Sequence, residues 1–253
     1  MNRSERNAYQ KTSYGDYRTI ERDEGLPMEQ EAGARVFVNR VYNWMFCGLM
    51  ITTVVAWAVS RYVATGEAAL RSIAALMIPC AIVELVLVIV LSATIRKLSV
   101  AAAGVMFIAY SALNGFMFST ILLQYTQTSV FLAFGSCAFM FAATSTFGYV
   151  TGMKLDTVGS YCFMGLIGII IASIVNFFLH SGVLDYIISY IGIAVFVGLT
   201  AWDTQKVRMI GEANGEEAQT DAMRKVAIIF ALSLYLDFIN LFLYMLRIFG
   251  RRR

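Results

Sequence analysis

The chain has 253 residues, of which 58% are hydrophobic and 15% charged, and its formal net charge at pH 7 is +3. A soluble domain is usually about 45–50% apolar and about 25% charged, so this composition excludes a soluble fold of this size. The mean hydropathy of +0.66 is typical of a protein that crosses a lipid bilayer several times, and it leaves no room for a separate soluble domain.

The N-terminal segment differs from the rest of the chain because it is polar. Residues 1–36 contain six basic and seven acidic residues and no apolar run of the kind found in signal peptides. We therefore expect residues 1–36 to form a largely disordered cytosolic tail and residues 37–253 to form the membrane domain.

Seven long apolar runs follow, and a helix needs about 20 such residues to cross the hydrocarbon core. Barrel strands would instead alternate over about 10 residues, so the runs predict an all-α fold with seven transmembrane helices. We expect the seventh helix to lie toward the centre because it has the most polar face. The predicted spans are Val41–Ser60, Ser72–Thr94, Ser99–Leu123, Ser129–Val150, Val158–His180, Gly182–Asp203 and Val226–Leu246.

The distribution of basic residues predicts the orientation, because lysine and arginine favour the cytosolic side of a membrane. With the N-terminus in the cytosol, 14 of the 20 basic residues fall on the cytosolic side. The odd number of spans then places the C-terminus on the opposite side. We interpret the arginines at 251–253 as a membrane-flanking cluster rather than a nucleic-acid site, since no phosphate-binding loop or RNA-binding motif accompanies them.

The cysteines and the single histidine have no spacing typical of a metal or redox site. Cys47, Cys80, Cys137 and Cys162 stand singly in apolar runs, and His180 lies at the end of another. Since no CxxC pair is present, the sequence predicts neither a zinc site nor a resident cofactor.

Three carboxylates within the spans are the strongest functional candidates. A central aspartate costs about 2.5–3.5 kcal/mol on the insertion scale, so such residues usually have a function. Glu84 lies within the second span, Asp203 ends the sixth, and Asp237 lies within the seventh. Asn240 shares the face of Asp237 because it is three residues further along the helix. A structural role, such as a hydrogen bond to a neighbouring helix, stays open for each carboxylate.

Two aspartates in separate spans are compatible with three kinds of chemistry. An intramembrane aspartyl protease would have a GxGD segment, whereas Leu234-Tyr235-Leu236 precedes Asp237. A retinal pigment needs a lysine in the last span, and that span has none. Calcium takes 6–8 oxygen ligands, and two carboxylates with an amide nearby could begin such a site.

The depth of the two aspartates in the membrane predicts where the sixth helix ends. Asp237 lies about 16 Å of helix from Val226, at 1.5 Å per residue. The two carboxyls can meet only if the sixth helix continues beyond Lys206. We therefore expect it to run to about Gly211, with Lys206 and Arg208 reaching toward the lipid headgroups.

Two segments resemble motifs of a known family. Ser233–Phe242 (SLYLDFINLF), followed by Leu246-Arg247, looks like the closing motif of the Bax inhibitor family, the transmembrane Bax-inhibitor-motif proteins. Asp203-Thr204-Gln205 is similar to the other acidic motif of that family. The resemblance covers roughly residues 35–253 and indicates a bacterial-type member in the plasma membrane.

The resemblance implies a calcium leak governed by pH, in which Asp203 and Asp237 face each other as a hydrogen-bonded pair. They would act as pH sensor and as a transient calcium site. The resemblance also implies an arginine that latches the pair near the cytosolic end of the second span. The candidate for this latch is Arg96, with Lys97 beside it. We expect Glu84 and Asn240 to line the cavity, Glu84 on the far side of the gate.

Two functions therefore stay open, and neither is enzymatic. In the first, two carboxyls held together in a low-dielectric interior cannot both ionise easily, so calcium flux depends steeply on pH between about 6 and 8. In the second, the protein transports nothing and acts as a regulator or adaptor of a membrane-embedded quality-control protease, or of cell-death or stress signalling. Only the second should require Met1–Arg35.

Overall fold

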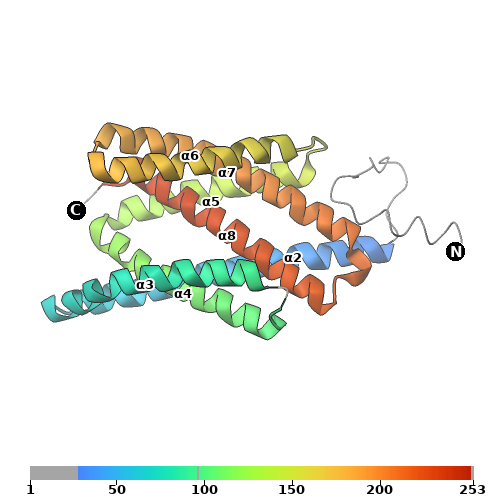
Figure 1. Ribbon diagram of the computed structural model, residues 1–253, viewed down its shortest axis with the longest axis horizontal. Coiled ribbons are helices and arrows are strands. Elements are labelled where there is room, and N and C mark those ends of the chain that lie inside the picture. The colour runs from blue at the N-terminus through green and yellow to red at the C-terminus, as the bar shows by residue number, and fades with distance from the viewer. Residues whose placement is uncertain (1–27, 96, 252–253) are drawn as a thin grey trace, which may run out of the picture.

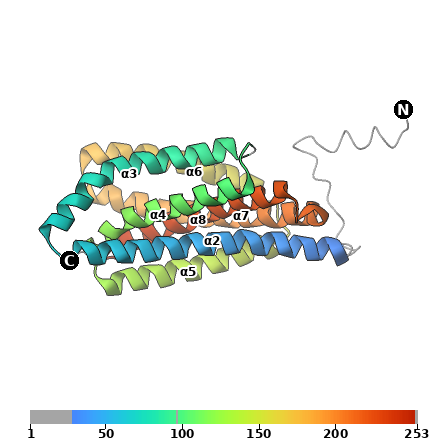
Figure 2. The ribbon, with the colours of Figure 1, turned by 90° about the horizontal axis from the view of Figure 1, so that it is seen from below.

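The structure, a computed structural model, describes residues 28–95 and 97–251. This part of the chain is all-helical, and seven of its helices are long and apolar enough to cross a membrane. They lie side by side as a bundle (Figures 1 and 2), which confirms the predicted fold class. The helices are α2 (Met28–Val63), α3 (Glu67–Thr94), α4 (Val100–Gln124), α5 (Gln127–Val150), α6 (Asp156–Leu179), α7 (Gly182–Ala213) and α8 (Asp221–Phe249), with a short 3-10 turn, η2 (Gly215–Glu217), before α8.

The first helix begins within the segment that the sequence predicted as a tail. Residues 1–27 lie outside the described residues, whereas residues 28–36 form the first turns of α2. This end of α2 packs against η2, and a Cβ on Gly33 would overlap the carbonyl group of Gly215. Arg40 also donates a hydrogen bond to the carbonyl oxygen of Ala218, at 2.6 Å. Tertiary packing therefore extends a helix that local polarity did not predict.

The sixth span continues well beyond Asp203, as predicted from the requirement that the two aspartates lie at the same depth in the membrane. α7 runs to Ala213, close to the expected end at Gly211. α8 then begins at Asp221, where the hydroxyl of Thr220 accepts a hydrogen bond from the backbone N–H of Met223. Much of the segment between the last two spans is therefore helical rather than loop.

The central position predicted for the last span is confirmed. In α8, 61% of the most apolar stretch is buried, against at most 33% in any other helix. α8 packs against α2, α4, α5 and α7, and it crosses the middle of the bundle in Figure 1. Its Tyr235 is fully buried, and the ring contacts Phe107 and Tyr110 of α4 edge-on.

Two helices stand at the outside of the bundle and flank α8. α3 and α6 are the least buried, with only 6% of the apolar stretch buried in each. α3 packs mainly against α4, and α6 packs against α7. In Figure 1 they lie on opposite sides of α8, α6 above it and α3 below it, and in Figure 2 both lie along the upper side of the bundle. Between them α8 presents half-buried residues such as Ser233, Leu236 and Asn240.

Candidate functional site

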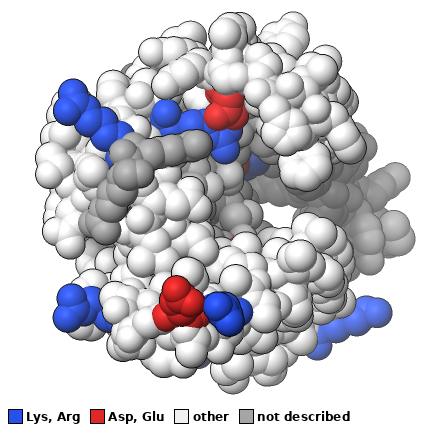
Figure 3. All heavy atoms as spheres, turned by 90° about the vertical axis from the view of Figure 1, so that its left-hand side faces the viewer, with Lys and Arg blue, Asp and Glu red and all other residues white. Residues whose placement is uncertain are grey.

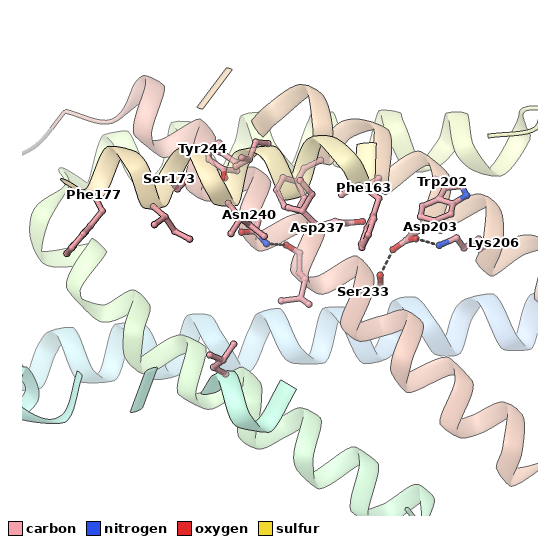
Figure 4. A pocket seen from close by; sticks show the side chains of 18 of the residues that line it. Phe163, Ser173, Phe177, Trp202, Asp203, Lys206, Ser233, Asp237, Asn240 and Tyr244 are labelled. Atoms are coloured by element: carbon pink, nitrogen blue, oxygen red, sulfur yellow. Dashed lines mark hydrogen bonds and ion pairs between the residues drawn. The ribbon is translucent and has the colours of Figure 1, made fainter. Parts of the chain in front are cut away.

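A cavity of about 1120 Å³ lies between α3, α6, α7 and α8. α6 lines it mostly with aliphatic and phenylalanine side chains, and α3 contributes Leu85. Most of the polar lining comes from the two helices that carry the predicted aspartates, and α6 adds Ser173 (Figure 4). The polar residues of these two helices are Trp202, Asp203 and Lys206 of α7 and Ser233, Asp237, Asn240 and Tyr244 of α8. The cavity is therefore apolar over most of its wall and polar where α7 meets α8.

Asp203 is buried and both of its carboxylate oxygens are engaged. Its Oδ1 is 2.9 Å from Nζ of Lys206, one helical turn further along α7. Its Oδ2 accepts a hydrogen bond from the hydroxyl of Ser233 on α8. Nζ of Lys206 also lies 3.1 Å from the centroid of the Trp202 ring, a cation–π contact. Asp203 thus joins α7 to α8 and has a positive charge beside it.

Asp237 differs from Asp203 because it lacks such partners. It follows Ser233 by one helical turn on α8, and only 5% of the residue is exposed. Its Oδ2 is buried and has no hydrogen-bond partner among the described residues. It interacts electrostatically with Asp203 and Lys206, and Figure 4 shows it between Asn240 and Asp203 along the cavity.

The two aspartates line one cavity, but the direct hydrogen bond that the resemblance implied is not found in the described part of the chain. Asp203 bonds instead to Lys206 and Ser233. Asp237 lies beside this ion pair, and its own Oδ2 has no hydrogen-bond partner among the described residues. The prediction was wrong about this hydrogen bond only, because α7 and α8 do bring the two aspartates to one cavity, as predicted.

Asn240 and Glu84 have different surroundings. Asn240 lines the cavity, and its side-chain amide donates to the carbonyl oxygen of Leu236 at 2.8 Å. On α3 it is Leu85, and not its neighbour Glu84, that lines this cavity. Glu84 interacts electrostatically with Tyr110 of α4 and Tyr235 of α8, whose rings contact each other where these two helices pack together.

The predicted latch, Arg96, lies outside the described residues, so its role stays a prediction. In the structure the cation beside Asp203 is Lys206. The sequence had predicted that the side chain of Lys206 reaches toward the lipid headgroups instead. Its spacing of three residues from Asp203 is typical of side chains that meet on a helix. This spacing could have identified Lys206 as a partner. Ser233 lies on the other helix, 30 residues further along the chain, and no local spacing indicates its contact with Asp203.

The carboxylates are too few for a tight metal site. Within the residues that the structure describes, no group of three or more His, Cys, Asp or Glu side chains could hold a metal ion. Since calcium takes 6–8 oxygen ligands, Asp203 and Asp237 would need water and neighbouring hydroxyl or amide groups to complete a shell. The arrangement suits transient contact with a cation better than stable binding.

The fold and the site define a class of protein: a polytopic helical membrane protein whose central helix borders an acidic cavity. Comparison with known families identifies the class more closely. The family model described as "Inhibitor of apoptosis-promoting Bax1" matches residues 34–253. The chain therefore belongs to the Bax inhibitor family, as its two acidic motifs indicated.

Bacterial proteins are similar to the chain over nearly its whole length. The "Inner membrane protein YbhL" of Escherichia coli strain K12 is 46% identical over 226 residues, which cover 89% of this chain and 96% of YbhL. An uncharacterized protein of Borreliella burgdorferi is 40% identical over 217 residues, 86% of this chain and 92% of the relative. The uncharacterized protein RP147 of Rickettsia prowazekii is 37% identical over 223 residues, 88% of this chain and 92% of RP147. None of these names states a transported ion.

Proposed function

We propose that the protein is a pH-sensitive, calcium-permeable leak of a bacterial inner membrane, in which Asp203 and Asp237 take up protons and contact the ion. The observation that carries the proposal is the buried Oδ2 of Asp237, which has no hydrogen-bond partner among the described residues and borders a cavity. Buried polar groups are nearly always paired, so an unpaired one calls for an explanation. A passing cation would supply the missing partner.

In this proposal Lys206 is a tethered counter-ion that keeps the pathway shut. Its ammonium group neutralises Asp203 and lies over Trp202, while Ser233 links the same carboxylate to α8. α7 and α8 are therefore held together beside Asp237. An entering ion would find only one carboxylate free, which is too little for tight binding and suits an ion that has to leave again.

Protons would act on this arrangement in two opposite ways. Protonation of Asp203 removes the charge that attracts Lys206 and loosens the contact between α7 and α8. Protonation of Asp237 removes the charge that attracts calcium. Opening and ion attraction thus change in opposite directions as the pH falls, and the flux should pass through a maximum. The titration belongs to the two coupled carboxyls rather than to either one.

Calcium flux into liposomes tests the proposal. We expect the wild-type protein to show flux that changes steeply between about pH 6 and 8, where isolated aspartates do not titrate. Asp203→Asn and Asp237→Asn should each flatten this dependence. The matched control is Asp221→Asn, which removes the same charge from an aspartate of α8 whose side chain is 79% exposed. A protein lacking both buried aspartates that kept the wild-type pH profile would overturn the proposal.

The inner-membrane location is proposed by analogy with YbhL of E. coli, whose name states it. The activity proposed is passive permeation and not catalysis. The alternative, a non-transporting regulator or adaptor of a membrane protease or of stress signalling, differs in requiring the N-terminal segment. Removing that segment while recording calcium flux therefore separates the two functions.

A further inference from the structure

The cavity is open toward the lipid as well as bordered by the aspartates. α3 and α6, which flank it, have the least buried apolar stretches of the seven helices. Several α6 side chains line the cavity and are also exposed on the outside of the bundle, such as Phe163 at 55% and Phe177 at 72%. Seen from the end where α8 finishes, the surface is hollowed between two groups of helices, and the charged residues gather at the rim (Figure 3). A molecule dissolved in the bilayer can therefore reach the cavity from the side.

The wall of the cavity matches a ligand that is mostly apolar. Leu85, Phe163, Ile174 and Phe177 provide hydrocarbon and aromatic surface along α3 and α6. A calcium ion would gain nothing from this surface. The volume of about 1120 Å³ lies slightly above the range of roughly 300–1,000 Å³ found for small-molecule pockets. The cavity is thus larger and more apolar than an ion pathway requires.

The polar end of the cavity matches a single positive charge. Lys206 already neutralises Asp203 at 2.9 Å, so Asp237 is the carboxylate left without a cation of its own. Its Oδ2 is buried and unpartnered among the described residues. The ring of Tyr244 also lines the cavity, and an aromatic face attracts a cation within about 6 Å. Charge complementarity therefore favours a monocation over a neutral lipid or an anion.

We propose that this cavity binds lipophilic monocations, molecules with one positive centre and an apolar body, which enter from the bilayer between α3 and α6. The positive centre lies beside Asp237 and the apolar body lies against α6. The inference does not depend on calcium permeation, because it requires only the cavity, its lateral opening and one unpaired carboxylate.

Tetraphenylphosphonium is a suitable probe, since its charge is permanent and its body is aromatic. The full-length protein in phosphatidylcholine nanodiscs, without calcium or any ion gradient, would be titrated with the radiolabelled probe. We expect saturable binding that Asp237→Asn weakens by about tenfold or more, the usual effect of losing a charge-assisted contact. Triphenylphosphine oxide, which has similar rings and no charge, should not compete. Asp221→Asn should bind like the wild type, because this aspartate of α8 has a side chain that is 79% exposed and lies outside the cavity lining.

A second variant covers the case in which Asp237→Asn folds poorly. Ser173→Trp adds bulk to the cavity wall on α6 and leaves the carboxylate unchanged, so it should also weaken binding. Absence of saturable binding, or equal affinity in the wild type and both cavity variants, would overturn the inference. Since calcium flux is measured separately, a protein that binds the probe but conducts no calcium would contradict only the proposed leak.

Discussion

Replacing Lys206 by glutamine tests whether the ion pair with Asp203 keeps the pathway closed. In the structure Nζ of Lys206 is 2.9 Å from Oδ1 of Asp203 and 3.1 Å from the centroid of the Trp202 ring. Glutamine keeps a polar side chain but loses the charge. The carboxylate of Asp203 would then keep only the hydroxyl of Ser233 as a partner.

The size of the effect follows from these contacts. A hydrogen bond to a charged group contributes about 1.5–3 kcal/mol, and a cation over an exposed aromatic ring adds about 0.5–1 kcal/mol. The Lys206 side chain is 31% exposed, so solvent screening reduces the sum. We expect a net loss of about 1–2 kcal/mol, which corresponds to a change of roughly 5- to 30-fold in the ratio of closed to open protein.

Calcium entry into dye-loaded liposomes at about pH 8 measures this ratio, because the ion pair between Lys206 and Asp203 should keep the wild-type protein closed there. Lys206→Gln should raise the basal flux roughly 5- to 30-fold and flatten its pH dependence. Lys206→Arg retains the charge and should stay near the wild type. Lys154→Gln, which removes an exposed lysine between α5 and α6, is the control for loss of charge alone. Wild-type flux and pH profile in Lys206→Gln would refute the role of the ion pair.

Three further changes test the site, the packing and the choice of function. Ser233→Ala removes the hydroxyl that links α8 to the carboxylate of Asp203, so the basal flux should rise, whereas Ser233→Thr keeps a hydroxyl and should stay near the wild type. Gly148→Val would overlap the backbone of Ala201 and should cost about 1–3 kcal/mol, seen as a lower melting temperature in detergent; Gly135→Val, which has open space, is the matched control. Deleting residues 1–27, which stops where α2 begins, should leave the flux unchanged, and a loss of flux would contradict the proposed leak.

The membrane architecture could be predicted from the sequence because the bilayer constrains it strongly. Every span needs about 20 apolar residues, so the seven helices were visible as runs. The position of α8 followed from its polar face, since Asp237 and Asn240 avoid lipid. The extension of α7 to Ala213 followed from a requirement of depth, because otherwise the two acidic motifs could not reach one cavity.

The contacts within the site were harder to predict, because they depend on which of several local possibilities the packing selects. Lys206 could equally reach the headgroups or turn back to Asp203, and the position of Trp202 beside it favours the second. Likewise, two aspartates of one cavity could bond directly. In the structure Asp203 accepts a hydrogen bond from Ser233 instead, and nothing in the spacing of the aspartates reveals this.

The sequence did not predict that α2 begins at Met28, because this start also depends on contacts between distant parts of the chain. Its first turns are polar and charged, which is typical of a solvated tail when only local sequence is considered. Gly33 allows the backbone of η2 to approach closely, and Arg40 binds the carbonyl oxygen of Ala218. These contacts join segments far apart in the chain, so no window of local sequence contains them.

The two ends of the α7–α8 pair are each held by an ion pair, and the two ion pairs differ in burial. At the end where α8 finishes, Nη1 of Arg247 lies 3.2 Å from Oδ1 of Asp185, which is near the start of α7. Both side chains are more than a third exposed, at 38% and 37%, so solvent screens this contact and it contributes little. At the other end the side chain of Asp203 is only 8% exposed, and its carboxylate contacts both Lys206 and Ser233 of α8. The loss of the buried contact should therefore change the packing of α7 against α8 more than the loss of the exposed one, which favours a gate where α7 ends and α8 begins.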